Sequence, residues 1–431
     1  MPYRYFLSFF LISCLNSPCI IAQKNTDLLS AIFKTNDNKI FQEVLGNPEK
    51  YRCQIIYSQI NRDQHNKPHF KNYYFHYDAG YYFNPASTVK MPLAFLSLEK
   101  LNKLKSKDIN KYTALQIDTC FPWQTSAYHD SSSQNGLPSI AHYIKKAFLV
   151  SDNDAYNRMY QFVGQQSINR ELHKKGYKDV RITRQFMGLS SDQNRYTNRF
   201  RFLKDGKVLY TQPCEHNTDS FDFSHVIKMG KVYLDKNDSL VNEPFDFTKH
   251  NNVPLGDLHK MLQSVIFPAS VPSSERFNIS EDDRNFLLQY LSQFPSETNY
   301  PKYNASKYFD SYVKFFFRDS SQKIPENIRV FNKVGWAYGF MTDVSYIADF
   351  KNNVEFMLSA TIYVNSDDIL NDNKYDYDSI GYPFLYQLGQ TIYQYELRRK
   401  RRFVPNLSSL KMHYEIRDAG DTRPSISEVD N

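Results

Sequence analysis

The sequence predicts an α+β fold, in which an antiparallel sheet of about five strands is flanked by helices and joined to an all-helical lobe. Two β-rich runs lie near the N-terminus, and the middle of the chain has helical periodicity. The C-terminal third contains further β-rich runs and ends in an amphipathic helix. Strands from the two ends of the chain can share one sheet while the middle folds apart. We therefore expect a cleft between sheet and lobe.

The N-terminal elements follow from the spacing of apolar side chains. Apolar residues at helical spacing predict a helix over Asp27–Leu45. Cys53–Ile60 and Tyr73–Tyr77 are rich in β-branched and aromatic residues, and the polar stretch Asn61–Pro68 between them is typical of a hairpin. A mostly apolar run over Ser87–Leu101 then predicts a buried helix.

The middle of the chain is predicted to be helical and then irregular. Pro138 begins one helix, since apolar residues follow it at spacings of three and four. Two more helices are expected over Asn153–Phe162 and Ser167–Lys175, the second ended by a glycine. Residues 185–252 are polar and rich in turns, with a hairpin over Phe200–Leu209. We interpret this stretch as an insertion into one domain.

The C-terminal part supplies the remaining sheet. Helices are expected over Leu255–Ile266 and Glu281–Phe294. Tyr382–Leu397 has the pattern of an amphipathic helix, and residues 403–431 are predicted to be a disordered tail. The expected strands between these helices are Ile328–Phe331, Thr342–Phe350 and Val354–Val364.

The N-terminus has the features of a secretory signal. Residues 1–22 contain one basic residue, no acid, an apolar run and a final small residue, Ala22. We expect cleavage there, a domain over residues 23–402, and an exported protein, periplasmic or secreted. In the alternative interpretation the run before Cys14 is a lipobox, and the protein is a membrane-anchored lipoprotein. Membrane association is expected only in that case.

Composition excludes several classes of partner. The chain has 53 Lys and Arg against 46 Asp and Glu, a net charge of +7, and its basic residues are scattered apart from Arg398–Arg402. This balance argues against a nucleic-acid partner. No apolar run after residue 22 approaches the roughly 20 residues that span a bilayer.

No metal or cofactor is expected. The cysteines that remain after cleavage, Cys53, Cys120 and Cys214, are far apart and form no C-x-x-C pair, so at most one disulfide can form. The 11 histidines have no metal-ligand spacing. The chain also lacks a phosphate-binding loop and a dinucleotide-binding glycine motif.

A serine and a lysine could form a reactive pair at the start of the first apolar helix. Ser87 and Lys90 are three residues apart in Ser87-Thr88-Val89-Lys90, so the lysine can point at the serine hydroxyl. A buried lysine loses its proton more readily and can act as a base. The pattern alone is not diagnostic, because it also begins at Ser97, Ser311, Ser320 and Ser408.

Two further motifs follow in a specific order. Ser151-Asp152-Asn153 lies between two predicted helices, and Lys333-Val334-Gly335 lies at the entry to a strand. This set resembles the class A β-lactamases and penicillin-binding proteins, serine acyl-transferases with S-x-x-K, S-D-N and K-T-G motifs. The resemblance covers about residues 25–400, interrupted by the insertion. Taken alone, the second motif would fit a helix cap.

The resemblance implies roles for three catalytic residues. Ser87 would be the nucleophile and Lys90 its proton acceptor. Ser151 would relay a proton to the leaving nitrogen.

It also implies a substrate-binding set. Asn153 would contact a substrate amide, and Lys333 would support the second motif and attract a substrate carboxylate. Gly335 and Trp336 would belong to the strand that binds substrate. The backbone amides of Ser87 and Trp336 would form an oxyanion hole.

The sequence departs from the family at two places. Val334 replaces the hydroxyl residue of the third motif, so carboxylate binding should weaken by about 1.5–3 kcal/mol. Class A enzymes use a glutamate after the second motif for deacylation, and alignment of Arg181-Ile182-Thr183-Arg184 with the segment before it brings Phe186 near that position. Glu243 is the candidate for a displaced equivalent of the glutamate.

We therefore expect an exported serine hydrolase that is acylated at Ser87 by a β-lactam amide and then hydrolysed. Val334 and the missing glutamate favour an alternative, a peptidoglycan peptidase or amidase or a slow-turnover penicillin-binding protein. Either substrate would be small, a β-lactam or a peptidoglycan-derived peptide. An alternative of another class is a catalytically silent binding protein that uses residues 185–252 to contact a partner.

Overall fold

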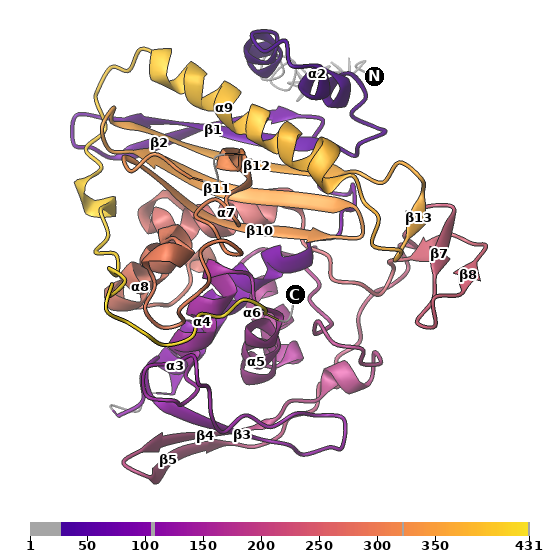
Figure 1. Ribbon diagram of the computed structural model, residues 1–431, viewed down its shortest axis with the longest axis vertical. Coiled ribbons are helices and arrows are strands. Elements are labelled where there is room, and N and C mark those ends of the chain that lie inside the picture. Colours follow the sequence, from indigo (N-terminus) through magenta and orange to yellow (C-terminus); the bar gives the residue numbers. More distant parts are fainter. Residues whose placement is uncertain (1–26, 105–107, 321–322, 430–431) are drawn as a thin grey trace, which may run out of the picture.

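A five-stranded antiparallel sheet forms the centre of the molecule, a computed structural model that describes residues 27–104, 108–320 and 323–429. Figure 1 shows helices on both faces of this sheet and a helical lobe below it. Because both faces are covered, β11 and β12 are buried along their whole length. The α+β prediction is confirmed. In sheet order the strands are β10 (Ile328–Ala337), β11 (Phe340–Asp349), β12 (Val354–Tyr363), β1 (Gln54–Arg62) and β2 (Pro68–Phe75).

Helices that follow one another along the chain build the lobe and the two layers around the sheet. α7 packs on the lobe side of the sheet and α9 on the other. The helices begin or end within a few residues of the predicted positions, and none in the described part of the chain is long and apolar enough to cross a bilayer. They are α3 (Lys90–Lys103), α4 (Ile140–Leu149), α5 (Asn153–Val163), α6 (Gln165–Lys174), α7 (Leu255–Ile266), α8 (Glu281–Ser292) and α9 (Tyr382–Arg398).

The predicted helix over Asp27–Leu45 is divided in two. Residues 27–33 are helical, and α2 spans Lys39–Gly46. The side chain of Asn36 accepts a hydrogen bond from the backbone N–H of Asn38, and the Asn38 side chain accepts from the N–H of Phe41. These side chains replace helical backbone partners, so one helix ends and the next begins.

The insertion at residues 185–252 closes on itself. Just before it, Arg181 exchanges two backbone hydrogen bonds of 2.8 Å with Asn252. The predicted hairpin is confirmed as β4 (Arg199–Lys204) and β5 (Lys207–Gln212). It pairs with β3 (Ala114–Asp118), which the sequence pattern did not predict.

The rest of the insertion consists of short strands beside the sheet. A disulfide joins Cys120 to Cys214, and Cys53 is a buried free thiol. This agrees with the expected limit of one disulfide. The short strands are β6 (Lys228–Met229), β7 (Val232–Leu234), β8 (Leu240–Val241) and β9 (Phe245–Asp246). Outside the insertion, β13 (Ile369–Leu370) pairs in parallel with β7.

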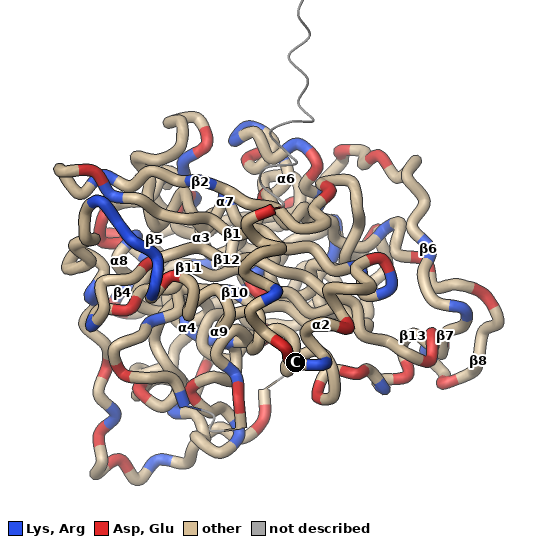
Figure 2. The backbone as a smooth tube through the Cα atoms, turned by 90° about the horizontal axis from the view of Figure 1, so that it is seen from above, with Lys and Arg blue, Asp and Glu red and all other residues tan. Residues whose placement is uncertain are grey.

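Basic and acidic residues alternate over most of the chain, with one longer basic run that follows α9 (Figure 2). Within the run Arg398–Arg402, Arg399 Nε lies 2.8 Å from Glu396 Oε2, and Arg401 pairs with the same oxygen. Glu396 is fully buried. The run therefore supplies two counter-charges to a buried carboxylate.

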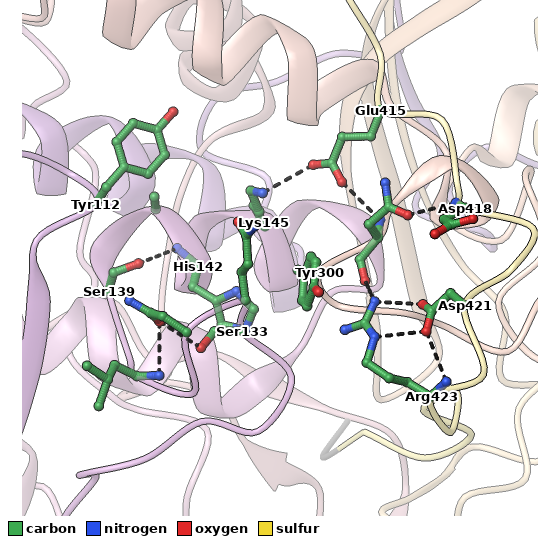
Figure 3. A pocket seen from close by; sticks show the side chains of 15 residues that line it. Tyr112, Ser133, Ser139, His142, Lys145, Tyr300, Glu415, Asp418, Asp421 and Arg423 are labelled. Atoms are coloured by element: carbon green, nitrogen blue, oxygen red, sulfur yellow. Dashed lines mark hydrogen bonds and ion pairs between the residues drawn. The ribbon is translucent and has the colours of Figure 1, made fainter.

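The C-terminal segment differs from the prediction of a disordered tail at residues 403–431. Residues 403–429 run from the sheet layer around α8 to the lobe (Figure 1). Leu410 is buried, and Figure 3 shows the Lys145 ammonium against Glu415, with 3.1 Å between Nζ and Oε1. Tyr290 donates a 2.6 Å hydrogen bond to the same carboxylate. These partners lie more than 100 residues away, so local composition gave no sign of them.

Candidate active site

Ser87 lies on a tight turn where the chain enters the lobe. A 3-10 turn over Ala86–Val89 leads directly into α3, and the backbone of Ala86 is left-handed, with φ 43°. A residue with a side chain rarely adopts that conformation, so the turn is locally strained. The hydroxyl and the N–H of Thr88 both bond the carbonyl of Pro85, which holds the turn. Ser87 itself stays partly exposed.

Lys90 is fully buried with its amine against the serine. Lys90 Nζ lies 2.8 Å from Ser87 Oγ and 2.7 Å from Asn153 Oδ1, and it also donates to the carbonyl of Ser151. Burial lowers the pKa of Lys90 to about 7, although the carboxylate of Asp152 opposes the shift. At neutral pH a large fraction of the amine is unprotonated and can accept a proton from the serine.

The second motif turns two of its three side chains toward this amine. Ser151 has a left-handed backbone, with φ 66°, between the end of α4 and the start of α5. Its Oγ lies 3.3 Å from Lys90 Nζ. Asp152 caps α5 by accepting a 2.8 Å hydrogen bond from the N–H of Ala155. The helix cap and the site therefore use different residues of the same motif.

Lys333 is on β10 and is the residue through which the sheet contacts Ser151. Its Nζ donates to Ser151 Oγ and to the carbonyl of Val334, each at 2.8 Å. Burial lowers the pKa of Lys333 well below that of an ordinary lysine, and the nearby Lys90 lowers it further. Ser151 therefore lies between two buried lysines, one from the lobe and one from the sheet.

Gly335 allows β10 to lie close to the turn that contains Ser87. A Cβ at this position would lie 2.6 Å from the carbonyl oxygen of Pro85 and 2.9 Å from the backbone nitrogen of Ser87. Those atoms belong to backbone and cannot move aside easily. The glycine of the third motif is thus required by packing between sheet and lobe.

The other residues of the third motif have separate surroundings. Val334 is fully buried in the core on the α9 side of the sheet, so it offers no group to a ligand. Trp336 lines the cavity at Ser87, and its ring packs edge-on against Phe315 and Tyr312 at 5.7 and 6.1 Å.

A cavity of about 660 Å³ lies over Ser87. No aspartate or glutamate of the described chain is among its lining residues, so it lacks a carboxylate base. Its residues are Asn84, Ala86, Ser87, Ser151, Asn153, Arg184, Gln185, Phe186, Met187, Gly188, His250, Asn251, Trp336, Ala337, Tyr338, Asn371, Asn373, Tyr375 and Tyr377.

Neither Phe186 nor Glu243 supplies a carboxylate to the cavity over Ser87. Phe186 lines the cavity with its ring centre 5.3 Å from Lys90 Nζ and is stacked on Tyr156 at 4.2 Å. Glu243 is exposed in the connection between β8 and β9 and does not line the cavity. The expectation that Glu243 supplies the base is therefore wrong. The insertion turns that loop toward solvent.

Several cavity residues were not singled out by the sequence analysis. Arg184 immediately precedes the insertion and His250 lies near its end, whereas Asn371, Tyr375 and Tyr377 come from the connection between β12 and α9. No sequence pattern indicates these residues, because only the fold brings them together at the cavity. In the described residues, no group of three or more His, Cys, Asp or Glu side chains is arranged to hold a metal ion.

One repeat of the S-x-x-K pattern is also buried. Ser311 and Lys314 lie beneath β10, where Lys314 Nζ donates to the carbonyl of Leu291 and to Asn332 Oδ1. Burial lowers the pKa of Lys314 to about 7, as for Lys90. Neither residue lines the cavity over Ser87, so a reactive-looking pair needs access as well as burial.

The chain is similar to a known enzyme family over its first two motifs. Residues 39–216 match the model of the beta-lactamase enzyme family. This segment is less than half of the chain and ends before the third motif. No curated protein sequence matches the chain.

Three solved structures to which the chain is similar are described as β-lactamases. A β-lactamase from Francisella tularensis is 13% identical over 83% of this chain and 100% of its own, with a TM-score of 0.46. One from Xanthomonas campestris pv. campestris is 12% identical over 85% and 98%, with a TM-score of 0.45. One from Sphaerobacter thermophilus is 13% identical over 84% and 98%, with a TM-score of 0.43.

The hydrogen bonds that join Ser87 and Lys90 to Ser151 and Lys333 are those of an active-site-serine hydrolase. The match over residues 39–216 shows that this part of the chain is similar to the beta-lactamase enzyme family. It agrees with the β-lactamase-like and penicillin-binding-protein-like serine hydrolase family expected from the three motifs.

Replacement of Gly335 tests the packing between sheet and lobe. We expect Gly335→Ala to lower the free energy of unfolding by about 1–3 kcal/mol, because its Cβ would overlap the backbone at Pro85 and Ser87. Gly46→Ala is the matched control, since no atom lies within 4 Å of the added Cβ. Urea denaturation measures both, and equal midpoints would contradict the packing argument.

Proposed function

We propose that the protein cleaves amide bonds by acyl transfer to Ser87. The observation that carries this proposal is the chain of hydrogen bonds from Ser87 through Lys90 and Ser151 to Lys333, at the edge of an accessible cavity. Lys90 takes the proton from Ser87 as the hydroxyl attacks the carbonyl. Ser151 passes a proton to the leaving nitrogen, and Lys333 holds the Ser151 hydroxyl in place.

The reacting amide is that of a β-lactam or of a small peptidoglycan-derived peptide, as in the resembled family. Asn153 contacts the substrate amide, and the backbone amides of Ser87 and Trp336 stabilise the developing oxyanion. Because Val334 offers no hydroxyl, a substrate carboxylate in this part of the cavity is held by fewer hydrogen bonds.

Slow loss of the acyl group distinguishes this proposal from rapid β-lactam hydrolysis. An acyl-serine is hydrolysed when a base activates water, and a well-placed base contributes roughly 10²–10⁴-fold. Phe186 occupies the region expected for the glutamate, and no carboxylate of the described residues lines the cavity. The geometry therefore favours a long-lived acyl-enzyme, the behaviour of a penicillin-binding protein.

Export is part of the proposal. Residues 1–22, expected to be a signal peptide, lie outside the described residues, as does Cys14. The disulfide between Cys120 and Cys214 supports an oxidising compartment such as the periplasm or the outside of the cell.

Covalent labelling tests the proposed function. Intact-protein mass spectrometry of residues 23–431 mixed with a fluorescent penicillin is expected to detect one adduct on the wild type and none on Ser87→Ala. The wild-type adduct should persist after free penicillin is removed, because deacylation lacks a carboxylate base. A wild type that never forms an adduct would contradict the proposal, and an adduct on Ser87→Ala would remove the assignment of the nucleophile.

The acylation rate should depend on the charge of Lys90. Only the neutral amine accepts a proton, and the pKa of Lys90 is lowered to about 7. The second-order rate constant for acylation should therefore rise roughly tenfold per pH unit below pH 7 and level off above it. Stopped-flow labelling from pH 5 to pH 9 measures this profile. A rate independent of pH in that range would contradict a role for Lys90 as the base.

A carboxylate placed at Phe186 should speed deacylation. Phe186→Glu brings an acid near Lys90 and the acyl-serine, where it can activate water. Phe186→Gln is the matched control, since it has similar size and cannot accept a proton. We expect the penicillin adduct of the Glu variant to disappear several-fold faster than that of the Gln variant. Equal rates of loss, followed by mass spectrometry, would refute the idea that the missing base limits turnover.

A further inference from the structure

We propose that Arg184, held by His250, forms an anion-binding subsite that recognises a negatively charged group on the acyl part of the substrate. The inference rests on the proposed function, in which Ser87 is the nucleophile. It adds a determinant of substrate specificity.

The two residues lie where the ends of the insertion meet. Arg184 lies three residues after Arg181 and His250 two residues before Asn252, and Arg181 and Asn252 form the isolated bridge that closes the insertion. Both residues line the cavity that contains Ser87. Both also line a neighbouring cavity of about 300 Å³ and so form part of the wall between the two.

The charge of Arg184 is not neutralised by a carboxylate. Its Nη1 donates a 2.5 Å hydrogen bond to Nε2 of His250, the one hydrogen bond of this guanidinium in the described part of the chain. The described residues offer it no ion pair. Asp246 lines the neighbouring cavity and not the one over Ser87. The remaining N–H groups of the guanidinium can therefore bind a carboxylate.

His250 supports the arginine without adding or removing charge. It is 9% exposed and lies among the rings of Phe247 and Tyr338, with centroids 4.9 and 5.8 Å away. Burial lowers the pKa of His250 to about 3, and the adjacent Arg184 contributes to the shift. The imidazole is neutral at physiological pH and accepts the proton that the guanidinium offers.

The backbone of Arg184 is also held in place. Its N–H donates to Asn251 Oδ1 at 3.1 Å, and its carbonyl accepts a 2.8 Å hydrogen bond from the hydroxyl of Tyr156. Little conformational freedom is lost from this backbone when a ligand binds, which favours affinity.

The part of the substrate that reaches Arg184 follows from the proposed catalytic roles. The leaving nitrogen must lie near Ser151, which Lys333 supports. Arg184 forms no hydrogen bond with either residue. Arg184 lines the cavity two residues before Phe186, whose ring centre lies 5.3 Å from Lys90 Nζ, and we assign this part of the cavity to the acyl side of the scissile bond. A negative charge there meets no carboxylate among the described lining residues.

Two penicillins that differ by one carboxylate test the proposal. Carbenicillin carries a carboxylate on its acyl side chain where benzylpenicillin carries hydrogen. The measured quantity is the ratio of their second-order acylation rate constants in each variant, which does not depend on the fraction of folded protein. We expect Arg184→Gln to lower the carbenicillin to benzylpenicillin ratio about tenfold or more, the effect of losing a charged hydrogen bond.

Two further variants separate charge recognition from structural damage. Arg184→Lys keeps the positive charge and should recover part of the ratio. Arg199→Gln removes an equal charge from an exposed position on β4, outside the cavity, and should leave the ratio unchanged. A ratio that is the same in the wild type and Arg184→Gln overturns the proposal.

Binding without reaction separates failure of this proposal from failure of the proposed function. If neither penicillin acylates the wild type, the proposed nucleophile is wrong. Calorimetric titration of Ser87→Ala with the same two penicillins, with and without Arg184→Gln, then measures the subsite alone. Tighter binding of carbenicillin that is lost with Arg184→Gln supports the subsite, and equal binding of the two penicillins overturns it.

Discussion

The burial of one amine governs the arrangement of the candidate active site. The Lys90 nitrogen is removed from water at the start of an apolar helix, and oxygens of Ser87, Ser151 and Asn153 surround it. A buried ammonium is costly unless polar groups replace its hydration. These residues reduce that cost, but Asp152, the carboxylate that raises the pKa of Lys90, caps α5 and has no hydrogen bond to this amine among the described residues. Because the compensation is incomplete, burial lowers the pKa of Lys90 to about 7.

The sheet completes the site by approaching the lobe closely. Lys333 adds a second buried amine at Ser151, and Gly335 lets β10 lie against the backbone of the turn that contains Ser87. Like charges repel, and Lys90 lowers the pKa of Lys333 beyond the effect of burial. The fold therefore positions Ser151 between two buried amines.

Much of this arrangement could be predicted from the sequence because its determinants are local. The order of the three motifs identified Ser87, Lys90, Ser151 and Lys333, and apolar periodicity located the helices and sheet strands. The side chains at Asn36 and Asn38 that divide the first helix were overlooked, although their signal is local.

The remaining features depend on contacts between distant parts of the chain. Packing of residues 403–429 relies on Lys145 and Tyr290, which no local pattern connects to Glu415. Glu243 was a candidate because of its place along the chain, and the path of the insertion decided its exposure. Wall residues such as Arg184 and His250 come together only through the folded closure.

Arg181 and Asn252 pair through their backbones at the base of the segment between them. Residues near this pair line the cavity, and residues farther along form a hairpin. Arg184 and His250 are within three residues of that closure, whereas the hairpin of β4 and β5 lies beside β3 at the end of the lobe farthest from the five-stranded sheet (Figure 1). Lengthening a loop beyond a closed stem costs little entropy and leaves the stem intact. The length of the excursion can therefore change without displacing Arg184 and His250 from the cavity wall, so loop length and cavity lining are structurally independent.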